Sequence, residues 1–139
     1  MKEIPSYTRL GPVLLDIENY ISDMNEFTIT RKNWNQDKWD TYSLSMIAFS
    51  LLNRVIDLGE VIIQEMRLGV PQHYRDIFSI LAKNGIIDET ISNELSSLVY
   101  YRNLLSHEYQ RITTKDLQKI LTKISVIQTF LDTIRAGLK

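Results

Sequence analysis

The chain has 139 residues, of which 44% are hydrophobic and 24% charged, a balance typical of one globular domain and not of a disordered segment. It has no cysteine, which excludes disulfides, zinc–thiolate sites and thiol chemistry. The net charge of −1 argues against a general nucleic-acid binder. Since neither a signal peptide nor a membrane span is predicted, we expect a single cytoplasmic domain over residues 1–139.

Two long helices are predicted in the N-terminal half. Apolar residues recur at helical spacing from Val13 to Phe27, so a first helix runs from about residue 12 to about residue 30. Pro12 fits its first turn, where the missing N–H has no helical partner. A second helix is predicted from about residue 40 to residue 67. Beside its apolar stripe, another face of that helix carries Asn53, Asp57, Glu60 and Gln64.

The C-terminal half continues the helical pattern. A short helix with inward Tyr74, Ile77, Phe78 and Leu81 ends at the Asn84–Gly85 pair, and Asp88 suits the N-cap of a fourth helix. The last helix begins near Thr113 and is continuous, since its apolar residues from Leu117 to Ile134 alternate steps of three and four. No segment alternates with period two. We therefore predict an all-α, up-and-down bundle of four long helices plus one short helix.

Positive charge collects at the C-terminal end. Residues 101–139 contain seven Lys or Arg against three Asp or Glu. Lys115, Lys119 and Lys123 are spaced four residues apart and form a basic ribbon beside the apolar seam of the last helix. Such a ribbon is either a solvated helix face or a surface that holds the phosphates of RNA.

Arg102 lies on the inward stripe of the fourth helix, where a charged group needs a partner. Asp57 or Glu60 of the second helix would give it a structural ion pair, and a functional site is the alternative. His107 follows five residues later, about 140° away around a straight helix. The two side chains therefore converge only if the helix ends or bends near residues 106–108, or if a second chain supplies one of them.

The residue types around Arg102 suit phosphate chemistry. A guanidinium offers a planar fork to phosphate oxygens, and a histidine exchanges protons near neutral pH. A glycine-rich phosphate loop and a G-x-S-x-G motif are absent, and no metal site is predicted, because the other histidine, His73, lies in a loop. Trp34, Trp39 and Tyr42 are either core residues or a set for base stacking.

The segment YYRNLLSHEY, with Arg102, Asn103, His107 and Tyr109 in an R-x4-H-x-Y pattern, resembles the HepT-like toxins of the HEPN superfamily. The likeness extends from about Leu44 to Leu131, and Ser106 departs from the small aliphatic residue common there. It implies a homodimer whose motif helices meet at a two-fold axis, and RNA cleavage without a metal or other cofactor. His107 would be the acid–base group, Arg102 would stabilise the phosphorane, and Asn103 would orient the site.

The resemblance also implies a partner, a minimal nucleotidyltransferase antitoxin that transfers AMP to Tyr109. The leading hypothesis is therefore an endoribonuclease toxin of a toxin–antitoxin pair. The alternative is a non-catalytic helical module that binds a nucleotide or a protein, with Arg102 held by Asp57 as part of the architecture.

Overall fold

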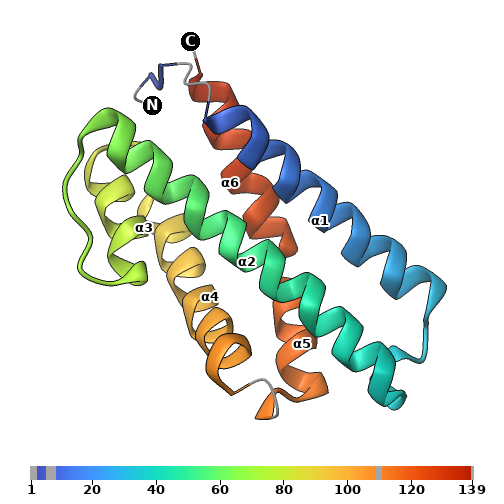
Figure 1. Cartoon of the computed structure of the whole chain (residues 1–139). Helices are drawn as coiled ribbons and strands as arrows, with labels where there is room; N and C mark the ends of the chain where they lie inside the picture. Colours follow the sequence, from blue (N-terminus) through green and yellow to red (C-terminus); the bar gives the residue numbers. More distant parts are fainter. Residues whose placement is uncertain (1–2, 6–8, 109–110, 139) are drawn as a thin grey trace.

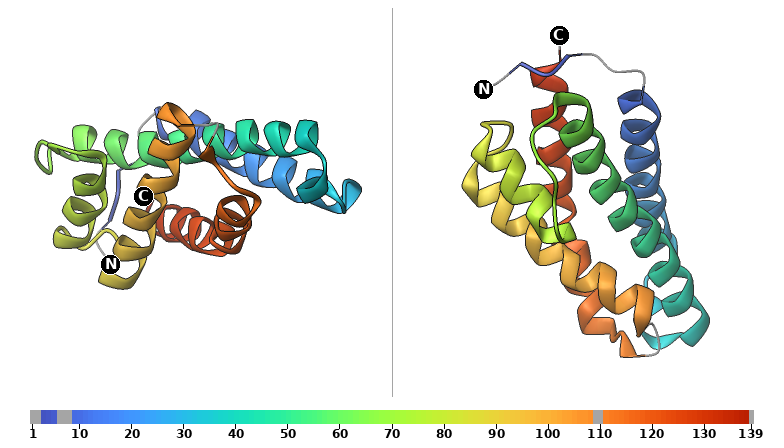
Figure 2. Two further views of the ribbon diagram at one scale, coloured as in Figure 1. Left: turned by 90° about the horizontal axis from the view of Figure 1, so that it is seen from below. Right: turned by 60° about the vertical axis from the view of Figure 1, so that its left-hand side comes forward.

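The computed structural model describes residues 3–5, 9–108 and 111–138, and their regular structure is almost entirely helical (Figure 1). Seen from below, α1 and α2 form one layer, and α5 and α6 lie on one side of it (Figure 2). The predicted all-α fold is confirmed. The elements in chain order are α1 (Leu10–Thr30), a 3₁₀ turn (Trp34–Gln36), α2 (Lys38–Met66), α3 (Tyr74–Lys83), α4 (Glu89–His107), α5 (Thr114–Thr122) and α6 (Ile124–Gly137).

The two N-terminal helices pack along each other as an antiparallel hairpin. Pro12 is the third residue of α1, within the first turn as predicted. The side chain of Asp37 caps α2 by accepting a hydrogen bond from the N–H of Asp40 at 2.9 Å. The inward face of α1 is formed by buried Leu10, Val13, Leu14, Ile17, Ile21 and Met24.

Helix α3 approaches α2 closely because Gly59 has no side chain. A Cβ at Gly59 would lie 2.4 Å from Cγ2 of Ile77, too close for any real contact. The helix ends at Asn84, and Gly85 follows with φ +74°, the left-handed conformation expected from the sequence. The close contact at Gly59 therefore fixes the distance between α2 and α3, the helix that begins at Tyr74.

The predicted N-cap at Asp88 and the predicted helix start near Thr113 are both confirmed. The carboxylate of Asp88 accepts a hydrogen bond from the N–H of Ile91 at 2.8 Å and begins α4. Thr113 and Asp116 form a reciprocal capping box at the start of α5, with bonds of 3.1 and 3.0 Å.

The continuous last helix is a wrong prediction, because the structure divides it at Lys123. This residue takes φ −96° and ψ 1°, and its N–H donates to the carbonyl of Ile120, which makes a tighter turn. Its side chain pairs with Glu94 of α4. The bend lets α5 contact both α2 and α4 while α6 packs on α4. Leu117, Ile120, Ile127, Leu131 and Ile134 remain buried on both sides of it.

Residues near the two ends of the described chain lie side by side. The N–H of Ile4 donates to the carbonyl of Gly137 at 2.7 Å, and Ile4 forms an isolated parallel bridge with Leu138. The side chain of Ile4 is fully buried in the core. Within the described ranges, no helix has the length and apolar character needed to cross a lipid bilayer.

Candidate functional site

The last turns of α4 carry three of the residues singled out from the sequence. Arg102 is half-buried, whereas Asn103 and His107 are exposed. The helix continues through His107 before Glu108 leaves it at φ −137°, ψ 41°. Arg102 and His107 thus remain about 140° apart around the helix. In the part of the chain that the structure describes, no hydrogen bond joins them, so one copy does not assemble the expected pair.

The guanidinium of Arg102 is held by amides and aromatic rings. Its Nε donates to Oδ1 of Asn53 on α2 at 2.8 Å, and its Nη1 donates to Oδ1 of Asn103 at 3.2 Å. Its Cζ lies 4.9 Å from the ring centroid of Tyr74 and 5.7 Å from that of Phe49. Among the described residues, no carboxylate pairs with it. The cation is therefore fixed in position, and no carboxylate of the described residues neutralises its charge.

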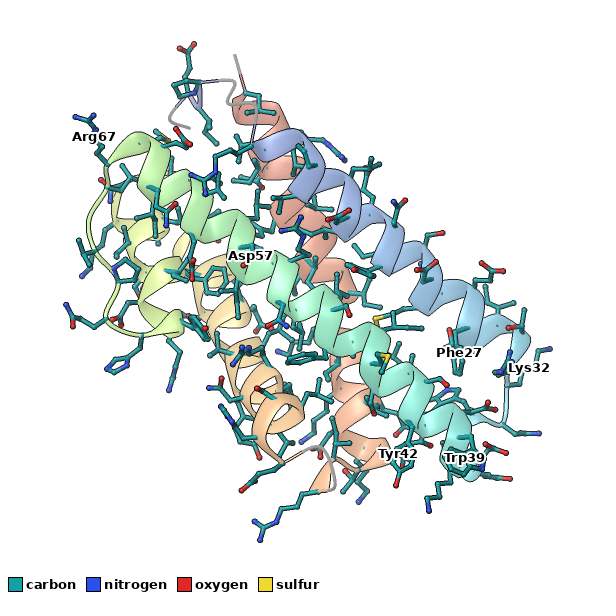
Figure 3. All side chains as sticks on the ribbon, in the orientation of Figure 1. Phe27, Lys32, Trp39, Tyr42, Asp57 and Arg67 are labelled. Carbon is teal, nitrogen blue, oxygen red and sulfur yellow. The ribbon has the colours of Figure 1, made fainter. Side chains whose placement is uncertain are left out.

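The ion pair of Asp57 with Arg102, one of the alternatives left open by the sequence, does not form. Asp57 lies near the middle of α2 (Figure 3), and its Oδ2 accepts a hydrogen bond from Nη1 of Arg54 at 3.1 Å. Arg54 also donates to Oδ2 of Asp16 on α1, from Nη2 at 2.6 Å and from Nε at 2.9 Å. A hydrogen bond to Asp16 is the largest of the causes that raise the pKa of Arg54 above its ordinary value. Asp57 belongs to this α1–α2 network because Arg54 is only three residues away on its own helix.

A pocket of about 500 Å³ opens beside Arg102, between α2, the start of α3 and α4. We call it the α3 pocket. Burial raises the pKa of the Glu60 carboxyl in its wall, and the charge of Asp57 adds to this effect. The pocket is lined by Glu60, Pro71, Gln72, His73, Tyr74, Arg75, Ile77, Val99 and Asn103.

Sequence reasoning missed three residues that hold Arg102, namely Asn53, Phe49 and Tyr74. Asn53 shares a helix face with Asp57, so the right face of α2 was identified and only the partner differs. Tyr74 is predicted to point inward, but its side chain is 40% exposed and lies against the guanidinium. An aromatic residue at the first position of a helix, after a Gly and Pro loop, is the signal that would have separated Tyr74 from the core residues of α3.

The basic ribbon is reduced to two lysines by the packing of α5. Lys115 and Lys119 are exposed on α5, as the four-residue spacing predicts. Lys123 stands at the break between α5 and α6, half-buried, and its ammonium group pairs with Glu94. Lys123 therefore has a structural partner, and the solvent-facing part of the ribbon consists of Lys115 and Lys119.

Two further predictions concern Tyr109 and the histidines. Tyr109 lies outside the described residues. His73 is exposed at the N-cap of α3, in the wall of the α3 pocket. Across residues 3–5, 9–108 and 111–138, no three His, Cys, Asp or Glu side chains are close enough to hold a metal ion.

The aromatic residues at the start of α2 divide into core and surface. Trp34 is buried, whereas Trp39 is 71% exposed and meets the half-exposed Tyr42 edge-on at 5.9 Å (Figure 3). From Tyr42 toward the C-terminal end of α2, an apolar groove of about 420 Å³ is lined by Tyr42, Ser45, Met46, Phe49 and Leu105. Since Phe49 also contacts Arg102, this apolar surface is continuous with the guanidinium site.

A family model described as "Ribonuclease HepT-like" matches residues 17–134. The chain is 32% identical over 82 residues to an mRNA nuclease HepT of Shewanella oneidensis, and the match covers 58% of this chain and 62% of that protein. It is 25% identical over 111 residues to a putative RNase, YutE, of Bacillus subtilis, with 79% and 76% of the two chains covered.

The fold is also that of a solved structure, a tri-AMPylated Shewanella oneidensis HEPN toxin in complex with an MNT antitoxin. The TM-score is 0.86, the sequence identity is 23%, and the match covers 94% of this chain and 99% of the other. This likeness establishes the fold alone, because an identity of 23% is too low to transfer a residue's role.

Proposed function

The chain belongs to the HepT-like ribonuclease family, and from this premise we propose that it is a metal-independent endoribonuclease toxin of a toxin–antitoxin pair. The observation that carries the proposal is the guanidinium of Arg102. It is fixed by Asn53, Asn103 and two aromatic rings, and the described residues give it no carboxylate. A positioned cation with unneutralised charge is suited to an external anion such as an RNA phosphate.

The proposed reaction is attack of the ribose 2′-hydroxyl on the adjacent phosphate. The 2′-oxygen loses its proton and forms the new bond to phosphorus, and the 5′-oxygen leaves with a proton. His107 is the acid–base group of these transfers. Arg102 stabilises the added negative charge of the phosphorane, and Asn103, which accepts a hydrogen bond from Arg102, keeps the guanidinium oriented.

We propose that the site is completed by a second copy of the chain. Arg102 and His107 diverge around α4, so a two-fold axis near the end of this helix is needed to bring them into one cleft. The apolar groove beside Arg102 and the exposed Met46 and Trp39 side chains, about 70% accessible, favour a covered surface there. The homodimer would thus bury apolar area and assemble the catalytic pair at once.

The proposed partner is a minimal nucleotidyltransferase that transfers AMP to Tyr109. It is supported by the AMPylated state of the Shewanella toxin in its complex with an antitoxin. A phosphate attached two residues after His107 would compete with RNA for Arg102. Lys115 and Lys119 on α5 are proposed to hold the RNA backbone, and the single domain is proposed to act in the cytoplasm.

The test of catalysis compares wild type with His107→Ala on purified RNA in EDTA. The change should lower the cleavage rate by about a hundred- to ten-thousand-fold. Because His107 is exposed, the circular dichroism spectrum and melting temperature should not change. Cleavage that required magnesium, or that survived the substitution, would contradict the mechanism.

The test of assembly mixes two inactive variants, Arg102→Gln and His107→Ala. If the two residues work across the dimer axis, the mixed dimer regains one complete pair and cleavage returns. A monomer in light scattering at micromolar concentration would contradict the composite site. For regulation, Tyr109→Phe should cleave RNA but gain no adenylate by mass spectrometry when it is produced with a cognate nucleotidyltransferase.

A further inference from the structure

The α3 pocket lies next to the proposed cleavage site, but the cleavage chemistry does not use it. Its volume of about 500 Å³ falls within the range of pockets that hold small ligands, roughly 300–1,000 Å³. Ile77 and Val99 are its buried members and give it an apolar floor, whereas Gln72, His73 and Arg75 are exposed at its rim. An apolar floor with a few polar groups around it suits a flat heterocycle.

The negative charge of the pocket favours the binding of a nucleobase over that of a phosphate. Glu60 is half-buried in the wall and has Asp57 close enough for the two charges to interact. An acidic wall repels phosphate but accepts hydrogen bonds from the exocyclic amino groups of adenine, cytosine and guanine. Arg75 stands at the exposed rim, where it can meet the phosphate of a neighbouring nucleotide.

Two residues both line the pocket and contact the guanidinium of Arg102. Tyr74 lines the pocket, and its ring lies 4.9 Å from Cζ of Arg102. Asn103 also lines the pocket and accepts a hydrogen bond from Arg102 Nη1. A nucleotide whose base enters the pocket therefore has its phosphate beside Arg102.

Hydrogen bonds within the chain hold the rim of the pocket. The carboxylate of Asp76 accepts hydrogen bonds from the backbone N–H groups of Gln72 and His73, each at 3.0 Å. Together with the close approach of α3 to α2 at Gly59, these bonds fix the wall that carries Tyr74. Binding then costs little reorganisation of the protein.

We propose that the α3 pocket is a nucleobase subsite, which takes a base next to the scissile phosphate and uses Glu60 to favour bases with an exocyclic amino group. The proposal rests on the proposed nuclease function for its biological role, but the pocket can be tested by binding alone. Uracil, which has no exocyclic amino group, is the discriminating base.

The binding experiment uses ¹⁵N-labelled His107→Ala protein and four 2′-O-methyl dinucleotides, ApA, CpC, GpG and UpU, with inorganic phosphate as the matched anion. The first three should shift the amide signals of Gln72, Ile77 and Val99, and UpU should bind about tenfold more weakly. Phosphate should leave these three signals unchanged. Absence of any shift at the pocket, or the same shifts with phosphate alone, would overturn the subsite.

The cleavage experiment compares base preference in wild type, Glu60→Gln and the control Glu26→Gln, which removes an exposed carboxylate from α1. Discrimination against uracil should fall about tenfold in Glu60→Gln and stay unchanged in the control. Cleavage with an unaltered preference in Glu60→Gln contradicts the subsite while leaving the nuclease intact. If the wild type does not cleave RNA while the dinucleotides still bind the pocket, the nuclease is contradicted and the subsite stands.

Discussion

Arg54, on α2, and Arg102, which contacts α2 from α4, are both half-buried, but their surroundings are opposite. Arg54 has two carboxylates, Asp16 and Asp57, which neutralise it and tie α1 to α2. Arg102 contacts two amides and two aromatic rings, which fix its direction. These described partners are neutral and do not cancel its charge. The comparison teaches that burial and hydrogen bonding do not by themselves distinguish architecture from function. The charge of the partners is what differs between these two arginines.

The largest expected effect separates the two arginines directly. Arg102→Gln should lower RNA cleavage by about a hundred- to a thousand-fold, because it removes a positioned donor to the developing charge. Its melting temperature should hardly change, since the neighbours left behind are neutral. Steady-state cleavage and thermal unfolding measure the two properties on one preparation. An equal loss of cleavage in Arg54→Gln would abolish the distinction.

A second change, at Gly59, affects the contact between α2 and α3 that positions Tyr74 beside Arg102. It should leave the Arg54 network intact. Gly59→Ala places a methyl group 2.4 Å from Ile77, so α3 must shift, which should cost about 1–3 kcal/mol of unfolding free energy. The shift should also move Tyr74 and weaken cleavage. Gly11→Ala is the matched control, because a Cβ there meets nothing within 4 Å. Denaturant unfolding that gives both variants the same stability would refute the close approach.

The Arg54 network should contribute to stability and not to cleavage. Arg54→Gln leaves Asp16 and Asp57 unpaired on adjacent helices, which should cost about 1 kcal/mol, since the groups are partly exposed. The double variant Arg54→Gln with Asp16→Asn should lose less than the sum of the two single changes. Additive losses in urea unfolding would show that the pair contributes nothing.

The smallest effect concerns Glu60 of α2, which lines the α3 pocket and interacts with Asp57 of the Arg54 network. Its pKa is raised in the folded state, mainly by burial, so ionised Glu60 opposes folding. The protonated form of Glu60 does not oppose folding. The stability that it allows is complete below the ordinary glutamate pKa and is lost as the pH rises through the pKa of the folded state. Glu60→Gln should therefore melt slightly higher than wild type at pH 7. The difference should vanish near pH 4; a gap that persisted there would indicate another cause.

Much of the fold follows from residues that act within their own helix. The apolar spacing of α1 and α2, the cap at Asp88, the helix start at Thr113 and the stop at Gly85 depend on local chemistry, and they appear where the sequence predicts them. The break at Lys123 does not, because the apolar spacing continues through it. Its causes are a turn and the pair with Glu94, both of which depend on how α4 packs.

The candidate site is predictable in its residues but not in its contacts. Arg102 and Asn103 stand out by type and spacing, whereas the choice of Asn53 over Asp57 depends on the rotation of α2 against α4. Asp57 also had a competing partner, Arg54, whose own second partner comes from α1. No spacing rule within one helix ranks such long-range competitors, so the sequence identified the face and left the pairing to the structure.

The neutral surroundings of Arg102 make the protein sensitive to the identity of the buffer anion. With no carboxylate beside it in the described chain, we expect the guanidinium to exchange chloride or other small anions with the solution. RNA must displace them, so replacing chloride by the larger, more weakly bound glutamate anion at constant ionic strength should tighten RNA binding. A site closed by an internal ion pair, like that of Arg54, holds no exchangeable anion and is indifferent to the replacement.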